Sequence, residues 1–67
     1  MHDHPLANGL MSKREVCAYF GNINPSTLYR GIRQGTFPPP IHVGGSSRWV
    51  RSECEAVLRR LMDGRAR

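Results

Sequence analysis

The segment of residues 37–49, FPPPIHVGGSSRW, limits the possible folds of this chain more than any other stretch. Its three consecutive prolines have no backbone N–H to donate, so regular strand pairing is expected to begin only near Ile41. Glycine and serine at positions 44–47 then favour a turn. We expect Ile41–Val43 to pair with Arg48–Val50 across that turn. The segment therefore predicts a short β-hairpin.

A short helix is predicted early in the chain. Ser12 and Glu15 have the spacing of a capping box, in which each side chain accepts a hydrogen bond from the other residue's backbone N–H. Apolar residues follow, and Gly21 suits the left-handed conformation that commonly ends a helix. We expect the helix over Lys13–Phe20, after a flexible leader of residues 1–11.

A second helix is predicted after a short turn. Asn24 suits the N-cap, and Pro25 suits the first helical position, where the missing N–H costs nothing. Leu28 and Ile32 are spaced to face the core together, and Gly35 ends the helix. Two helices joined in this way are typical of a helix–turn–helix.

A third helix is predicted after the hairpin, because Ser52 and Glu55 repeat the capping-box spacing. Its apolar residues have the i, i+3, i+4, i+7 spacing of an amphipathic helix: Cys54, Val57, Leu58 and Leu61. We expect the ordered domain to span residues 12–62, followed by a frayed tail over residues 63–67. The order helix, helix, hairpin, helix predicts a mainly α fold with a small β-hairpin, a winged helix–turn–helix whose wing is the hairpin. Phe37 and Trp49 are expected to hold the wing against the core, with base stacking the alternative for Trp49.

Size and charge narrow the function. A chain of 67 residues with 39% apolar residues forms a small core with little room for an enclosed substrate pocket. Its five acidic residues are scattered over predicted caps and tails, so we expect neither catalysis nor a cofactor. The net charge of +5 favours a polyanionic partner, although a ribosomal or membrane-surface protein would have a similar balance. All the cationic residues except Lys13 are arginine, which suits bidentate contacts to phosphate and guanine.

The two cysteines indicate a reducing compartment. Cys17 and Cys54 lie among apolar residues of different predicted helices and lack zinc-site spacing with any histidine. We expect reduced thiols in the core instead of a disulfide, and hence a cytoplasmic protein. His2 and His4 are expected to bind metal weakly at most. No apolar run is long enough for a signal peptide or a membrane span.

Several strings along the chain are typical of one family: EV at 15–16, Gly21, STLYR at 26–30, GTFPPPI at 35–41, GG at 44–45, RW at 48–49 and SE at 52–53. On these residues the chain resembles the AlpA family of short prophage regulators, within the wider MerR- and excisionase-like winged-helix proteins. The resemblance covers about residues 11–61. One position departs from it, because Asn22 lengthens the turn between the first two helices. This extra residue is expected either to tilt the second helix or to bulge outward.

The resemblance implies a transcriptional regulator of a prophage or other mobile element, bound to double-stranded DNA at the bacterial nucleoid. The second helix would lie in the major groove and the wing on the flanking backbone. A recognition helix presents its first turns to the bases. The residues that we expect to contact DNA are Ser26, Thr27, Tyr29, Arg30 and Arg33 in the second helix, Gly45, Ser46, Ser47, Arg48 and Arg51 in the wing and its flanks, and Lys13 and Arg14 in the first helix. We expect Arg30 or Arg33 to reach a base; the alternative is that both contact only phosphates.

Two other functions stay open. An excisionase would use the same contacts to bend DNA for an integrase. A protein-interaction adaptor would use the winged fold to bind a protein partner. Integrase and further copies of the chain on DNA are candidate partners, whereas a membrane and a small-molecule substrate are not expected.

Overall fold

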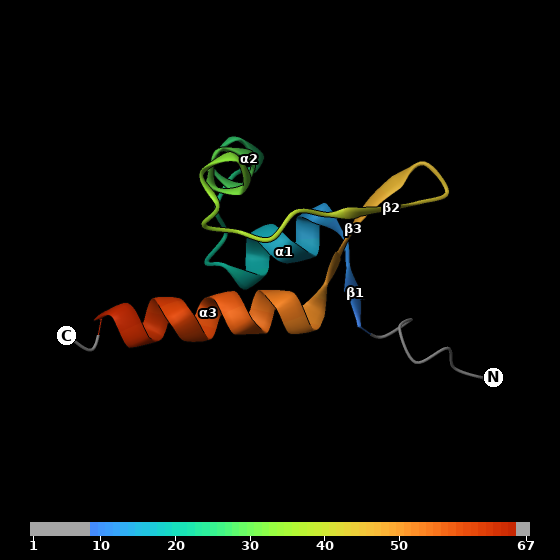
Figure 1. The fold of residues 1–67 in the computed structure, drawn as a ribbon. Helices are drawn as coiled ribbons and strands as arrows, with labels where there is room; N and C mark the ends of the chain where they lie inside the picture. The colour runs from blue at the N-terminus through green and yellow to red at the C-terminus, as the bar shows by residue number, and fades with distance from the viewer. Residues whose placement is uncertain (1–8, 66–67) are drawn as a thin grey trace.

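The computed structural model describes residues 9–65 and confirms a mainly α winged helix–turn–helix arrangement (Figure 1). Residues 1–8 of the expected leader, with His2 and His4, and residues 66–67 of the expected tail lie outside the described residues. The elements in chain order are β1 (Leu10–Met11), α1 (Lys13–Tyr19), α2 (Pro25–Gln34), β2 (Ile41–Val43), β3 (Ser46–Val50) and α3 (Arg51–Arg65). In Figure 1, α1 lies between α2 and α3, and the wing formed by β2 and β3 projects to one side.

The first two helices begin at the predicted caps. The N–H of Ser12 donates to Oε1 of Glu15 at 2.8 Å, and the N–H of Glu15 donates to Oγ of Ser12 at 3.1 Å, so the capping box of α1 is complete. The N–H of Thr27 donates to Oδ1 of Asn24 at 2.9 Å. Each bond satisfies a backbone donor that the first helical turn leaves free. Local sequence therefore sets where both helices start.

Asn22, the residue that lengthens the turn between α1 and α2, lies at the surface. Gly21 and Asn22 have φ angles of 94° and 62°, in the left-handed region that glycine and asparagine adopt most readily. Asn22 is exposed, while Ile23 packs against the core and its N–H donates to the carbonyl of Cys17 at 3.1 Å. Because Asn24 still caps α2, the longer turn leaves the start of that helix intact.

The core is centred on Trp49, whose side chain is fully buried. Its Nε1–H donates to the carbonyl of Pro38 at 3.0 Å and so ties the proline run to β3. This confirms Trp49 as a core anchor. The buried residues packed with it come from both ends of the described chain: Met11, Val16, Cys17, Leu28 and Cys54. A wing held in this way keeps a fixed position relative to α1 and α2.

The wing is more sharply turned than the sequence suggested. The prediction paired Ile41–Val43 with Arg48–Val50 across four turn residues, and this register is wrong. Ile41 pairs with Arg48 and Val43 with Ser46. Gly44 and Gly45 form a two-residue turn with φ angles of 56° and 84°, the positive values that a tight type I′ hairpin turn needs.

The last two residues of β3 pair with a third strand. Leu10 and Met11, assigned from the sequence to the leader, form β1 and pair with Val50 and Trp49. The sheet order is β1-β3-β2, so β3 uses its first residues for β2 and its last for β1. Met11 is only 2% exposed. The fold therefore begins before the predicted boundary at Ser12.

The third helix is also longer than predicted at both ends. It begins at Arg51, so Ser52 lies in its first turn and not at the N-cap. The N–H of Arg51 donates to the carbonyl of Gly9 at 2.6 Å, a partner from the β1 side that no local pattern could reveal. The helix then continues to Arg65, through residues that the sequence assigned to a frayed tail.

Both cysteines are free and buried, which confirms them as core residues without a disulfide. Cys54 is fully buried, and Cys17 is 8% exposed. Burial raises the pKa of the Cys54 thiol, and the neighbouring carboxylate of Glu53 raises it further. Cys54 is therefore held as a neutral thiol that packs like a small apolar side chain.

Gly31 → Ala is expected to destabilise the fold, although alanine is the better helix former by about 1 kcal/mol. A Cβ on Gly31 would lie 2.7 Å from Cε2 of Phe37 and closer still to Cδ2. The ring has little freedom to move, because its centroid is 4.7 Å from that of Phe20 and the N–H of Phe37 donates to the carbonyl of Gly31 at 3.2 Å. Overpacking of this kind costs about 1–3 kcal/mol, which exceeds the gain in helix propensity.

Urea denaturation followed by circular dichroism measures this effect. The matched control is Gly64→Ala in α3, where a Cβ meets nothing within 4 Å. That substitution should stabilise the protein by about 0.5–1 kcal/mol. Equal stabilisation by both substitutions would show that Phe37 does not pack tightly on α2.

Candidate nucleic-acid interface

Charge is segregated between the elements. No acidic residue occurs from Val16 to Ser52, the part of the chain that contains α2 and the wing. Three acidic residues belong to α3: Glu53, Glu55 and Asp63. Figure 1 places α3 on the other side of α1 from α2. The α2 side of the molecule therefore has a positive potential, which attracts a polyanion.

The helix α2 has one buried and one exposed face. Leu28 and Gly31 are buried and face the core. Ser26, Arg30 and Arg33 are exposed and lie at i, i+4 and i+7, so they share one stripe on the solvent side. The arrangement leaves two guanidinium groups and a hydroxyl free to meet a partner along the helix. Thr27 lies off this stripe, half-buried beside the N-cap.

A hollow of about 330 Å³ lies where α1, α2 and the wing meet. It is lined by Ser12 and by six of the twelve residues that were predicted from the sequence to contact DNA: Lys13, Arg14, Tyr29, Ser46, Ser47 and Arg48. These residues come from three separate parts of the chain. Three cationic side chains and four hydroxyl groups thus share a single concave surface, which we call the junction hollow.

Two side chains of the junction hollow are already held in place. Arg48 is half-buried, and its Nη1 donates to the carbonyl of Ser47 at 2.9 Å. Tyr29 is 37% exposed, with its ring centroid 6.5 Å from that of Trp49. Lys13 and Arg14 are exposed at the start of α1. The hollow therefore combines two positioned side chains, Arg48 and Tyr29, with two exposed cationic side chains that can adjust.

The tip of the wing is narrow and exposed. Gly44, Gly45 and Ser46 all lie at the surface, and the two glycines have no side chain to keep a neighbouring molecule away. Their backbone can therefore approach a partner closely. Arg51, the remaining predicted residue, is half-buried at the other end of β3, where α3 begins. The structure thus separates it from the tip of the wing.

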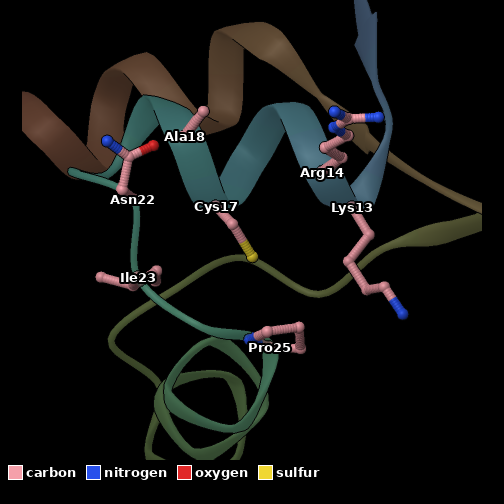
Figure 2. Close-up of a pocket in the computed structure, with 7 residues that line it drawn as sticks. All are labelled: Lys13, Arg14, Cys17, Ala18, Asn22, Ile23 and Pro25. Atoms are coloured by element: carbon pink, nitrogen blue, oxygen red, sulfur yellow. The ribbon is translucent and has the colours of Figure 1, made fainter.

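A second hollow, of about 370 Å³, lies between α1 and the turn that leads to α2 (Figure 2). Lys13 and Arg14 line this hollow as well as the first. Figure 2 shows the Lys13 and Cys17 side chains on the side of α1 that faces α2, with Asn22 and Ile23 across from them. The first turn of α1 therefore contributes cationic groups to the surface on both sides. No sequence pattern indicates this hollow, because its lining depends on the conformation of the turn.

Among residues 9–65, no cluster of three or more His, Cys, Asp or Glu side chains could hold a metal ion. None of the described helices is long and apolar enough to cross a membrane.

Comparison with known proteins gives one match. The model of the family described as prophage CP4-57 regulatory protein (AlpA) matches residues 9–60. No curated protein and no solved structure matches the chain. The matched range begins beside β1 and includes α1, α2, the wing and most of α3, so it covers the fold described above. The chain therefore belongs to the AlpA family of prophage regulatory proteins.

Proposed function

We propose that this chain is a sequence-specific DNA-binding protein that regulates transcription in a prophage or another mobile element. The observation that carries the proposal is the junction hollow, in which Lys13, Arg14 and Arg48 converge beside the exposed face of α2. Membership of a regulatory family supports the same reading. We propose no catalytic role, and binding to chromosomal DNA would keep the protein at the nucleoid.

In the proposed complex α2 lies in the major groove. Ser26 and Arg30, on its exposed stripe, meet the base edges first, and Arg33 follows one turn later. A guanidinium group can donate two hydrogen bonds to N7 and O6 of guanine, which discriminates against other bases by about 1–3 kcal/mol. Thr27 lies beside the start of α2 and contributes at the edge of this contact.

The junction hollow would hold a phosphate of the DNA backbone. Lys13, Arg14 and Arg48 supply positive charge, and the hydroxyls of Ser46 and Ser47 supply further donors. Because Arg48 is already fixed by its bond to the Ser47 carbonyl, less side-chain entropy is lost on binding. The Tyr29 hydroxyl adds a donor from α2. Gly45 lets the wing follow the strand, and Arg51 extends the positive flank.

The salt dependence of binding tests this proposal. A DNA site is first selected from a random pool, and affinity is then measured by fluorescence anisotropy at several salt concentrations. The logarithm of the affinity should fall linearly with that of the salt concentration, with a slope that reflects about three to five phosphate contacts. Replacement of Lys13 or Arg48 by glutamine should reduce the slope by about 1 and weaken binding to all sequences equally.

Arg60→Gln is the matched control, because Arg60 is an exposed arginine of α3. It should leave the slope unchanged. A flat salt dependence of the wild-type protein, without preference for the selected site, would favour the protein-interaction adaptor. An excisionase would show the same binding, and a recombination assay with the integrase separates that role from regulation of transcription.

A further inference from the structure

Large apolar side chains are exposed at the two ends of the molecule. Ile41 and Val43, on the wing, are 43% and 49% exposed. Leu61 and Met62, near the end of α3, are 45% and 48% exposed. Figure 1 shows the wing and the end of α3 pointing in opposite directions. The proposed contacts with DNA use none of these four side chains.

The apolar pair on the wing forms a small convex surface. Ile41 and Val43 alternate with His42 along β2, so both point to the same face of the wing. The strand β2 is at the edge of the sheet, in the order β1-β3-β2. Edge strands of soluble proteins are commonly protected by charged residues or proline. Here two aliphatic side chains occupy a three-residue edge strand, on an element only two strands wide.

The end of α3 has a concave surface that, like the wing, includes apolar side chains. A hollow of about 400 Å³ is lined by Tyr19 of α1 and by Glu55, Leu58, Arg59 and Met62 of α3; we call it the α3 hollow. From Leu58 to Gly64 no residue of α3 is fully buried, although Val57 before them is only 5% exposed. Helix ends gain most of their stability from packing of an apolar face. The α3 hollow is therefore a surface that a partner can cover.

The orientation of α2 relates these two surfaces to DNA. Figure 1 views α2 nearly along its axis, while the wing and α3 extend across the view. With α2 along the major groove, the line from the wing to the end of α3 thus runs roughly along the DNA. The described residues extend 44 Å in their longest direction. One turn of DNA is about 34–36 Å, which is shorter than this length, so the ends of two copies with the same orientation on adjacent turns overlap.

The α3 hollow contains charges of both signs, whereas the wing is positive. Glu55 and Arg59 both line the α3 hollow, and Asp63 is exposed about two turns after Glu55. The wing contains Arg48 and lies in the part of the chain without acidic residues. Two wings, both positive, therefore repel each other, whereas the α3 hollow offers the carboxylate of Glu55 to a positive wing.

We propose that, on DNA, Ile41 and Val43 of one copy dock into the α3 hollow of the next copy. This inference rests on the proposed DNA binding and names the surfaces that adjacent copies use. The contact joins two different surfaces, so it can repeat in one direction along direct repeats of the binding site.

The size of the contact determines when it forms. Two aliphatic side chains in one shallow hollow bury far less than the roughly 1,200 Å² typical of a stable interface. The free protein therefore stays monomeric at micromolar concentration. Two copies on neighbouring sites have an effective concentration in the millimolar range, at which a weak contact produces cooperative binding.

Cooperativity on paired sites tests the inference. Separate DNA probes carry the selected site in different arrangements. One has a single site, one has a direct repeat with centres one turn apart, and one has an inverted repeat with the same spacing. The wild-type protein should bind the direct repeat about tenfold more tightly than two independent sites predict. Val43→Thr and Met62→Ser should each remove this gain and leave single-site affinity unchanged. Leu61→Ser is the matched control, because Leu61 is equally exposed on α3 and does not line the hollow.

A mixture of the two variants sharpens the test. A copy with Val43→Thr keeps an intact α3 hollow, and a copy with Met62→Ser keeps an intact wing. One of their two orders on a direct repeat therefore restores the contact, and the mixture should recover part of the cooperativity. Cooperativity only on the inverted repeat, equal loss with Leu61→Ser, or no recovery in the mixture would overturn the head-to-tail contact. Loss of single-site binding would instead count against the proposed function.

Discussion

Replacement of Trp49 by alanine is expected to leave most of the chain unfolded at physiological temperature. The indole is fully buried in a cluster that also contains residues from β1, α1, α2 and α3. Removal of so large a buried side chain costs about 3–5 kcal/mol. A single small core of this kind supplies only about 3–5 kcal/mol of stability in total. The loss therefore equals the whole stability of the domain, and the helical circular dichroism signal should collapse.

Trp49→Phe separates the contribution of the buried side-chain volume to stability from that of the hydrogen bond. Phenylalanine keeps most of the apolar packing but cannot donate to the carbonyl of Pro38, a buried residue. A buried acceptor left without its donor costs about 1–3 kcal/mol, so this variant should fold with a lower urea midpoint. Leu61→Ala, at a surface position, should change stability by at most about 0.5 kcal/mol. A wild-type urea midpoint for Trp49→Ala would contradict the central role of the indole.

Features set by local chemistry could be predicted from the sequence. The starts of α1 and α2 each need one side chain and one backbone N–H three residues apart, and both caps form where Ser12 and Asn24 indicate. Gly35, with a φ angle of 84°, ends α2 because its left-handed conformation suits glycine. Patterns of this kind involve neighbours in sequence, so the fold class followed from them.

Features set by distant partners could not be predicted in the same way. The strand β1 is only two residues long and has no periodicity, and it exists because β3 passes beside it. Trp49 and Val50, predicted to pair with β2, pair with that same strand. The helix α3 starts at Arg51 because the carbonyl of Gly9 accepts from its N–H. Each of these features depends on a contact between residues that are far apart in the sequence.

The candidate interface likewise has one part that local sequence predicts and another part that depends on distant contacts. The sequence predicted that four residues of α2 reach the bases: Ser26, Thr27, Arg30 and Arg33. Three of them share an exposed stripe, and Thr27 lies off it. The junction hollow depends on how the wing packs beside α1. The sequence predicted six of its lining residues individually, but it did not indicate that they converge. Convergence of charge from three elements is a tertiary property that appears only with the fold.

Arg30→Ala is expected to weaken binding to the selected DNA site by about 10- to 100-fold, the loss of one bidentate contact to guanine. Arg33→Ala should have a smaller effect, since it lies one turn further from the start of α2. Both side chains are exposed, so neither substitution should change the urea midpoint. Anisotropy titrations against the selected site and a scrambled site of equal length measure the two affinities separately.

The ratio of the two affinities identifies what each arginine does. A residue that reads a base loses affinity for the selected site far more than for the scrambled one, whereas a phosphate contact loses both equally. Arg60→Ala removes the same charge from α3 and sets the scale of a purely electrostatic loss. A second selection with Arg30→Ala should then lose preference at one base pair and keep the others. Unchanged affinity in both Arg30→Ala and Arg33→Ala would show that α2 is not the recognition helix, because no other exposed guanidinium group lies on its stripe within the described chain.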